Sequence, residues 1–288
     1  MKLGASLPVG DIGTGPTVMR DYAQAAEGLG YDYLVGPDHV LGGNPNVDHG
    51  GRRMGTTATA YHDPFVLFAF LAGVTKKIGF AAGVLILAQR QAALVAKQAA
   101  CLDELCEGRF RLGVGVGWNE IEFQGLGEDF RTRGKRSEEQ VRFMQALWKE
   151  PHVTFKGEFH QLDDGGINPR PKSGSVPIIV GGHSEAAARR AGRLGNGFFP
   201  SIGRPADTMP LIDIARRAAE AAGRDPGAIE MLAGCPDLLP GSGKDAEAAI
   251  KERVAQGIGR IVLPSSAFMP NLEESLARFG ETVIRPFG

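Results

Sequence analysis

Short apolar runs alternate with amphipathic helical stretches along almost the whole chain. In one of these helical stretches, Val95, Ala99, Leu102 and Cys106 follow one another at spacings of four, three and four residues, which places them on one helix face. Eight strands, each followed by a helix, are typical of a (β/α)₈ barrel, so the sequence predicts an α/β TIM barrel with insertion segments. A doubly wound open parallel sheet is the competing arrangement. The runs that predict strands are residues 3–7, 33–35, 78–87, 110–116, 178–180, 197–199, 229–232 and 260–263.

Glycine and proline mark where the predicted helices end. Gly30 and Gly108 each follow a helical stretch, as glycine after a helix end commonly does. Two segments interrupt the alternation: a polar, glycine-rich loop at 36–62, and a weakly alternating stretch at 153–162 that predicts an inserted hairpin. No repeat or linker divides the chain, so we expect a single domain over residues 1–288. The helices are expected at 16–29, 64–74, 136–148, 184–194, 205–222, 244–256 and 271–283, with one more that carries Val95 to Cys106 and closes at Gly108.

The composition is that of an ordinary globular protein, except for glycine. Hydrophobic residues make up 43% and charged residues 23%, which excludes a disordered or fibrous chain. Lys plus Arg number 32 against 33 Asp plus Glu, so the basic field that nucleic-acid binding requires is missing. The 41 glycines are about twice the usual share of about 7% and indicate many tight turns and close backbone approaches.

Membrane insertion and secretion are not expected. The longest apolar runs, 65–74 and 80–88, are far shorter than the roughly 20 residues that span a bilayer. The first residues lack the basic segment and apolar core of a signal peptide. Three cysteines are an odd number and favour reduced thiols, so a cytoplasmic protein is predicted.

The first candidate site follows the second predicted strand. Active sites of such barrels lie at the carboxyl ends of the strands, and here Gly36-Pro37 leads into Asp38 and His39. An Asp-His pair in this position is suited to hold a cofactor edge and to transfer a proton, because imidazole titrates near neutrality. The alternative is a capping Asp followed by a solvent-facing His.

Glycines recur after the fourth predicted strand. Gly113, Gly115 and Gly117 alternate before Trp118 and Asn119, but the glycine that a dinucleotide fingerprint requires next is replaced by Trp118. Alternating glycines remove side chains from one strand face and leave room for a flat ring or a phosphate. The alternative is that small residues only make space for bulky neighbours.

A phosphate site is predicted after the fifth strand. Val180 ends that strand, and Gly181-Gly182-His183-Ser184 opens the next helix. Free N–H groups and the positive end of a helix dipole at this point favour an anion, although Ser184 is also a natural helix cap. Ser201 and Arg204, after the sixth strand, are a possible second phosphate contact or an ordinary loop.

Metal and nucleophile chemistry are weakly indicated. Five residues near the 36–62 loop could in principle gather around a metal ion, but they lack standard ligand spacing, so no metal site is predicted. No Gly-x-Ser-x-Gly elbow is present, and Cys101 and Cys106 fall among apolar helix residues. The five candidate ligands are His39, Asp48, His49, His62 and Asp63.

These motifs resemble those of the luciferase-like flavin and deazaflavin oxidoreductases, the luciferase-like monooxygenase superfamily, and in particular its coenzyme F-420-dependent branch. The similarity covers nearly the whole chain. It is carried by residues 36–39, 83–87, 94–100, 108–120, 130–136, 169–171 and 177–182.

The resemblance implies a barrel with insertions, often dimeric, and a tricyclic ring bound across the strand ends. Asp38 and His39 would lie near that ring, and Gly83-Val84 would be a bulge in the third strand that is often a non-prolyl cis peptide. A further set would contact the ring and its phosphate-bearing side chain. The residues of that set are Gly115, Gly117, Asn119, Val180, Gly181, Gly182, His183 and Ser184.

The activity implied is hydride transfer between ring carbon 5 of coenzyme F-420 and a small organic substrate, with His39 as the general acid. An FMN-dependent monooxygenase that uses reduced flavin and dioxygen is the alternative, and a non-catalytic flavin-binding protein is a third. Tyr61 and Trp118 are expected to line the substrate pocket, with a dimer contact as the alternative, and a homodimer is expected. Residues 88–91 lack the proline common after the third strand, and the basic set of the sugar-phosphate dehydrogenases is missing, which disfavours a sugar phosphate.

Overall fold

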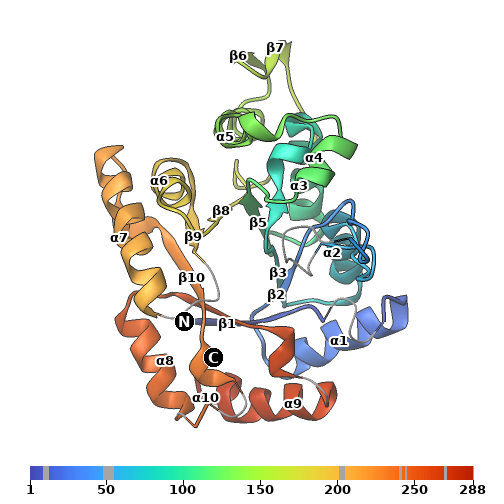
Figure 1. Cartoon of the computed structure of the whole chain (residues 1–288), viewed down its shortest axis with the longest axis vertical. Coiled ribbons are helices and arrows are strands. Elements are labelled where there is room, and N and C mark those ends of the chain that lie inside the picture. Colours follow the sequence, from blue (N-terminus) through green and yellow to red (C-terminus); the bar gives the residue numbers. More distant parts are fainter. Residues whose placement is uncertain are drawn as a thin grey trace.

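Eight parallel strands close into a barrel surrounded by helices in the computed structural model (Figure 1). The structure describes residues 1–8, 13–47, 55–200, 205–239, 242–243, 245–268 and 271–287. The barrel strands are β1 (Lys2–Ser6), β2 (Tyr33–Gly36), β3 (Gly79–Ala82), β5 (Phe110–Gly115), β8 (Ile178–Gly181), β9 (Gly197–Phe199), β10 (Glu230–Gly234) and β11 (Arg260–Leu263). Because β3 pairs with β5 and β11 pairs with β1, the sheet has no open edge. The predicted TIM barrel is confirmed, and the open-sheet alternative is wrong.

The third barrel strand is broken. The single run predicted at 78–87 forms β3 and a separate two-residue strand, β4 (Leu85–Ile86), which also pairs with β5. The peptide bond between Gly83 and Val84, at the break, is cis. Hydrophobicity is continuous across the break, so the period of the sequence does not reveal it.

The helices lie close to their predicted positions. Asp63 caps the helix that follows β2, because its Oδ1 accepts hydrogen bonds from the N–H groups of Phe65 and Val66. Helix α4 (Glu120–Gly125) lies in a segment for which no helix was predicted. The other helices are α1 (Pro16–Gly28), α2 (Pro64–Val74), α3 (Ala92–Leu105), α5 (Arg133–Lys149), α6 (Glu185–Leu194), α7 (Pro205–Ala221), α8 (Ala246–Ala255), α9 (Leu272–Phe279) and α10 (Arg285–Phe287), with a π-helical turn at Gly280–Ile284.

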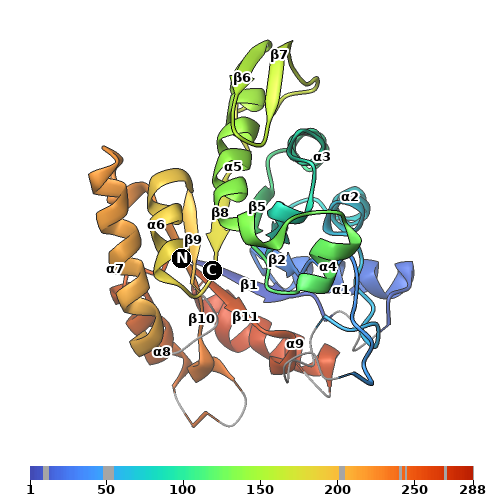
Figure 2. The same cartoon turned by 45° about the horizontal axis from the view of Figure 1, so that its top comes forward.

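The predicted hairpin insertion is confirmed. Strands β6 (Val153–Lys156) and β7 (Gln161–Gly165) pair in antiparallel fashion and project beyond the barrel (Figure 2). Glu139 of α5 anchors the hairpin turn, because its carboxylate accepts the backbone N–H groups of Glu158, Phe159 and His160 at 2.7–2.8 Å. The hairpin is therefore attached to α5 rather than to the barrel.

Alternate strand residues enter two separate hydrophobic clusters. Outward-facing residues, such as Leu34 and Leu112, pack against the helices in one large cluster that runs from Leu3 to Ile284. A small second cluster fills the middle of the barrel. Burying each large apolar side chain stabilises the fold by about 1.5–3 kcal/mol, so the larger outer cluster contributes most of the folding energy. The second cluster consists of Tyr33, Val35, Ala81 and Val262, with Phe199 beside it.

Candidate active site

His39 lies at the carboxyl end of β2 against a buried glutamate. Its Nδ1 is 3.3 Å from Oε2 of Glu122, whose side chain is only 1% exposed. The other oxygen, Oε1, accepts the backbone N–H groups of Val40 and Leu41 at 2.9 and 3.2 Å. Because a carboxylate only accepts hydrogen bonds, Nδ1 of His39 carries a proton and donates it. The ring is thereby oriented, and Nε2 forms no hydrogen bond to a described residue.

Glu122 is held in its ionised form. Burial raises the pKa of this carboxyl, but the hydrogen bond and charge of His39, the Leu41 N–H and the Gln89 amide outweigh it and lower the pKa below its usual value. The Gln89 amide lies 3.4 Å from Oε2. A buried carboxylate with these partners fixes the position and tautomer of His39.

Two aromatic rings flank His39. The ring centroid of Tyr61 lies 4.8 Å from that of His39, and the Trp118 centroid lies 6.1 Å away in an edge-on arrangement. A Cβ on Gly55 would approach His39 Cε1 to 3.1 Å and Trp118 Cη2 to 3.2 Å, so the backbone there lies directly against both rings. The structure thus brings together three residues that the sequence singled out from separate segments.

Asp38 belongs to the framework of the barrel mouth, the end of the barrel at which the strands have their carboxyl ends. It is 3% exposed and is bound by Arg90, whose Nη2 donates to Oδ1 at 2.7 Å, and by the Ile86 N–H at 2.9 Å. Burial raises the pKa of the Asp38 carboxyl, and the charge of Arg90 opposes that effect. Arg90 also pairs with Asp63 at 3.0 Å. Asp38 therefore ties β2 to the end of the broken strand, and its contact with a cofactor stays a prediction.

The glycines of β5 and β8 make room for Val84. A Cβ on Gly115 would lie 2.6 Å from Val84 Cγ2, and one on Gly181 would lie 2.6 Å from Val84 Cγ1. A neighbouring side chain therefore fills the space beside both glycines, as the steric alternative expects for the glycines of β5, and the contact of Gly115 and Gly181 with a cofactor stays a prediction. Val84, just after Gly83, is half-buried, so it supplies an apolar surface at the mouth.

Two further glycines are also in close contact with side chains. A Cβ on Gly117 would lie 2.6 Å from Ile86 Cγ2 and 3.0 Å from Phe123 Cε2, and Gly117 has a positive φ of 78°. Gly182, with φ of 141°, faces the Cβ of Ala187 at 2.8 Å. Side chains are excluded at both positions by contacts within the protein. A cofactor role for these glycines remains a prediction.

Asn119 carries an unpaired donor. The residue is 7% exposed, and its Nδ2 is buried without a hydrogen-bond partner. Leaving such a donor unsatisfied costs about 1–3 kcal/mol, so functional sites are where such groups are retained. The Oε1 atom of Gln89, beside Glu122, is unpaired as well. These atoms fit a ligand that brings its own polar groups, as a flavin or deazaflavin ring does.

Some of the hydrogen-bonding groups at the start of α6 already have partners within the protein. Ser184 caps the helix by accepting the Ala187 N–H at 3.3 Å, and Nδ1 of His183 donates to the Pro200 carbonyl. Gly182 N–H donates to the Phe199 carbonyl at 3.2 Å. Val180 belongs to the outer core, so its side chain points away from the mouth. Phosphate binding at this helix start is therefore still a prediction.

The remaining candidate site residues either bind groups away from His39 or lie outside the residues that the structure describes. His62 Nε2 donates to the Thr14 carbonyl at 2.9 Å, away from His39 and its glutamate. Across the described ranges, no group of three or more His, Cys, Asp or Glu side chains could hold a metal ion, and no helix is long and apolar enough to cross a membrane. The predicted residues outside the described ranges are Asp48, His49, Ser201 and Arg204.

Sequence reasoning missed Glu122 and Arg90. Glu122 lies 83 residues after His39, in a segment for which no helix was predicted. The available signal was Asn119 ahead of Glu120 and Glu122, a pattern of polar and acidic residues that favours a helix start. It would have predicted α4, but not the partner of Glu122.

Two named relatives are oxidoreductases of different kinds. The chain is 31% identical over 251 residues to a pyrimidine monooxygenase of Allorhizobium ampelinum, a match that covers 80% of this chain and 66% of that protein. It is 33% identical over 227 residues to an F420-dependent glucose-6-phosphate dehydrogenase of Segniliparus rotundus, covering 75% of this chain and 63% of that protein. The matches thus span slightly less than two thirds of the length of either relative.

A solved structure supports the fold. An F420-dependent secondary alcohol dehydrogenase superposes with a TM-score of 0.78 at 21% identity, over 98% of each chain. The family model described as luciferase-like monooxygenase matches residues 4–282. The resemblance drawn from the motifs is thereby confirmed, and the chain belongs to the luciferase-like monooxygenase family.

Proposed function

We propose that this protein transfers a hydride between the deazaflavin coenzyme F-420 and a small organic substrate at the carboxyl-terminal mouth of the barrel. The observation that carries the proposal is the His39 imidazole, oriented by buried Glu122. Hydride transfer to or from a carbonyl or alcohol requires an accompanying proton transfer, and an anchored imidazole is suited to it. The relative that uses F420 at 33% identity supports the choice of coenzyme.

The residues of the mouth fit such a coenzyme. Val84 presents an apolar surface, Asn119 has an unpaired buried amide, and the start of α6 offers the positive end of a helix. When bound, F-420 supplies a ring carbon that accepts or releases a hydride. The features of the mouth match a flat ring with an anionic side chain.

The protein's own groups would handle the proton. The Nε2 atom of His39 would donate a proton to a substrate oxygen during reduction, or accept it during oxidation. Glu122 would stabilise the charged imidazolium in either direction. Tyr61 and Trp118, which both lie beside His39, would contact the apolar part of the substrate and keep water away.

An FMN-dependent monooxygenase is the second candidate. The 31% identity to the pyrimidine monooxygenase supports a monooxygenase, and 30% identity to an FMNH(2)-dependent dimethylsulfone monooxygenase of Pseudomonas fluorescens supports the flavin. The same mouth would hold reduced flavin, because the two ring systems share their flat shape.

Titration of the purified protein with F-420 and with FMN, followed by ring fluorescence, distinguishes these candidates. We expect F-420 to bind at least about tenfold more tightly, a difference of about 1.4 kcal/mol. Asn119→Leu should weaken F-420 binding without lowering the stability of the free protein, because it removes an unpaired donor. Gln161→Leu, the same kind of change on the exposed hairpin, is the control. Preferential binding of FMN would favour the monooxygenase, and binding of neither would refute both.

We also propose that the protein is a homodimer through α2 and α3. Helix α2 contains no polar or charged side chain, although Val66 is 68% exposed and Phe70 is 39% exposed. Leu94 and Leu105, on one face of the neighbouring α3, are 52% and 67% exposed. A helix that is apolar on all sides is normally buried, so a second copy of this surface is a suitable cover.

A further inference from the structure

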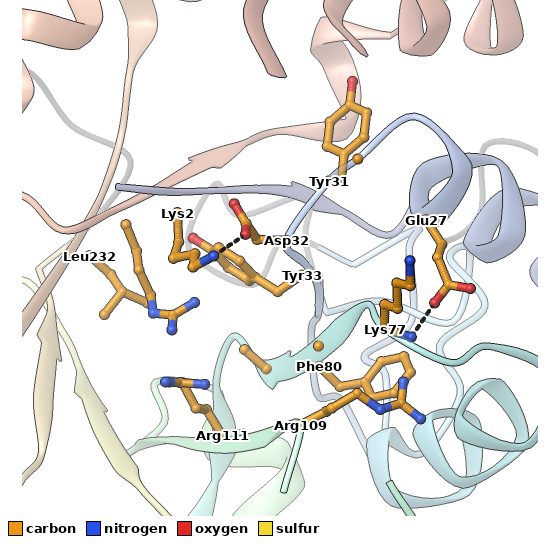
Figure 3. Close-up of a pocket in the computed structure, with 14 residues that line it drawn as sticks. Lys2, Glu27, Tyr31, Asp32, Tyr33, Lys77, Phe80, Arg109, Arg111 and Leu232 are labelled. Carbon is orange, nitrogen blue, oxygen red and sulfur yellow. Dashed lines mark hydrogen bonds and ion pairs between the residues drawn. The ribbon is translucent and has the colours of Figure 1, made fainter. Parts of the chain in front are cut away.

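A charged cavity lies at the opposite end of the barrel, among the amino-terminal ends of the strands (Figure 3). Its volume is about 440 Å³, within the range of small-molecule sites. Lys2, Tyr33, Arg111 and Arg260 contribute to its wall from the starts of β1, β2, β5 and β11. The cavity is separate from the His39 mouth, because the strands run from one to the other.

Two arginines share one carboxylate at this cavity. Arg260 donates from Nε to Oε1 of Glu230 at 2.5 Å, and Arg111 donates from Nε to Oε2 at 3.1 Å. Each guanidinium also carries four N–H groups on its two Nη atoms, and these form no hydrogen bond to a described residue. The Arg260 side chain is only 8% exposed and lies over the Tyr33 ring at 5.0 Å. The orientation of Arg260 is therefore fixed, and its Nη groups are available as donors to a ligand.

The cavity has an excess of positive charge. Three carboxylates offset its five cationic side chains only in part, which leaves two positive charges in a chain whose net charge is −1. Asp32 pairs with Lys2 at 2.6 Å, and Glu27 accepts the backbone N–H groups at the start of β3. The cations are Lys2, Lys77, Arg109, Arg111 and Arg260, and the carboxylates are Glu27, Asp32 and Glu230.

Arg109 adds charge and forms no ion pair with a carboxylate of the described part of the chain. Its guanidinium donates to the carbonyls of Cys106 and Ile78 at 2.8 and 2.7 Å. These bonds hold the side chain in place but do not neutralise it. In a partly enclosed space, uncompensated charge attracts an anion more strongly than it would at the open surface.

We propose that this cavity binds a phosphate group, as the free ion or as part of a small phosphomonoester. The Nη groups of Arg111 and Arg260 are its donors, because guanidinium forks match phosphate oxygens. A phosphate dianion balances the two excess charges. Lys2 extends the positive surface at the rim, where Figure 3 shows it directed towards Asp32. The proposal does not depend on the coenzyme, which would occupy the other end of the barrel.

Isothermal titration with sodium phosphate, at constant ionic strength, tests the proposal. The wild type should give one saturable site with millimolar or tighter affinity. Arg111→Gln should weaken binding at least about tenfold, because it removes one of the two forks. The fold should tolerate this change, since Glu230 keeps Arg260 as a partner. If that variant fails to fold, Lys2→Gln at the exposed rim should still weaken binding by a smaller factor.

Arg217→Gln is the matched control, because Arg217 is exposed on α7 and carries the same charge. It should leave phosphate affinity within about twofold of the wild type. Tighter binding of glycerol 3-phosphate than of phosphate would identify a phosphomonoester as the ligand, and the reverse would identify the free ion. No saturable heat with either, equal weakening by Arg217→Gln, or equally tight binding of succinate would overturn the proposal.

Discussion

At the scale of single residues, the candidate site depends on a pair that only folding brings together. His39 was predicted from its place after a strand, since that place alone puts it at the barrel mouth. Glu122 was not, because its contact with His39 joins positions 83 residues apart. Position along a barrel can thus be predicted from periodicity, whereas a side-chain partner on another segment cannot.

The lowered pKa of Glu122 predicts a pH dependence of stability. Because the ionised form is favoured in the folded state, Glu122 contributes stability above its ordinary pKa of 4.5, and this contribution is lost as the pH falls through the lower folded pKa. Glu122→Gln removes the charge and places an amide opposite the N–H groups of His39 and Gln89. The variant should be less stable than wild type at pH 7, and the difference should shrink at pH below 4.5.

Urea unfolding at both pH values measures this difference. Glu120→Gln, a neighbouring exposed glutamate on the same helix, should show little change in stability at either pH. A stability difference for Glu122→Gln that is the same at both pH values would contradict the proposed charge interaction.

At the scale of elements, the hydrophobic pattern predicted the barrel strands but not the breaks and short helices between them. All eight barrel strands were predicted, because each is a short apolar run between helical stretches. The break between β3 and β4 was not detectable by period, since Leu85 and Ile86 continue the apolar run. Helix α4 was not predicted, because six residues are too few to show a helical period.

The apolar faces of α2 and α3 lead to a prediction at this scale. Light scattering coupled to size-exclusion chromatography should give about twice the 30.6 kDa mass of one chain. Val66→Glu should shift the protein towards the monomer, because it places a charge on a buried interface.

Val254→Glu, at a residue 50% exposed on α8, is the control and should not change the mass. A wild type that stays at 30.6 kDa at micromolar concentration, or a dimer that both variants leave intact, would argue against this interface.

At the scale of the whole molecule, the two ends of one barrel differ in chemistry. The carboxyl end has an oriented imidazole, aromatic rings and the apolar Val84, and the amino end has a cluster of cations around Glu230. The first end was expected from the fold class. The second was not, because Arg111, Glu230 and Arg260 belong to three strands and meet only when the barrel closes.

A crystal structure of the protein with F-420 tests most directly whether the carboxyl-terminal mouth is the coenzyme site. We predict electron density for the coenzyme in contact with Val84 and within hydrogen-bond distance of Asn119 Nδ2, which would then have a partner. Coenzyme density at the amino-terminal cavity, or a mouth without coenzyme at saturating concentration, would contradict the account.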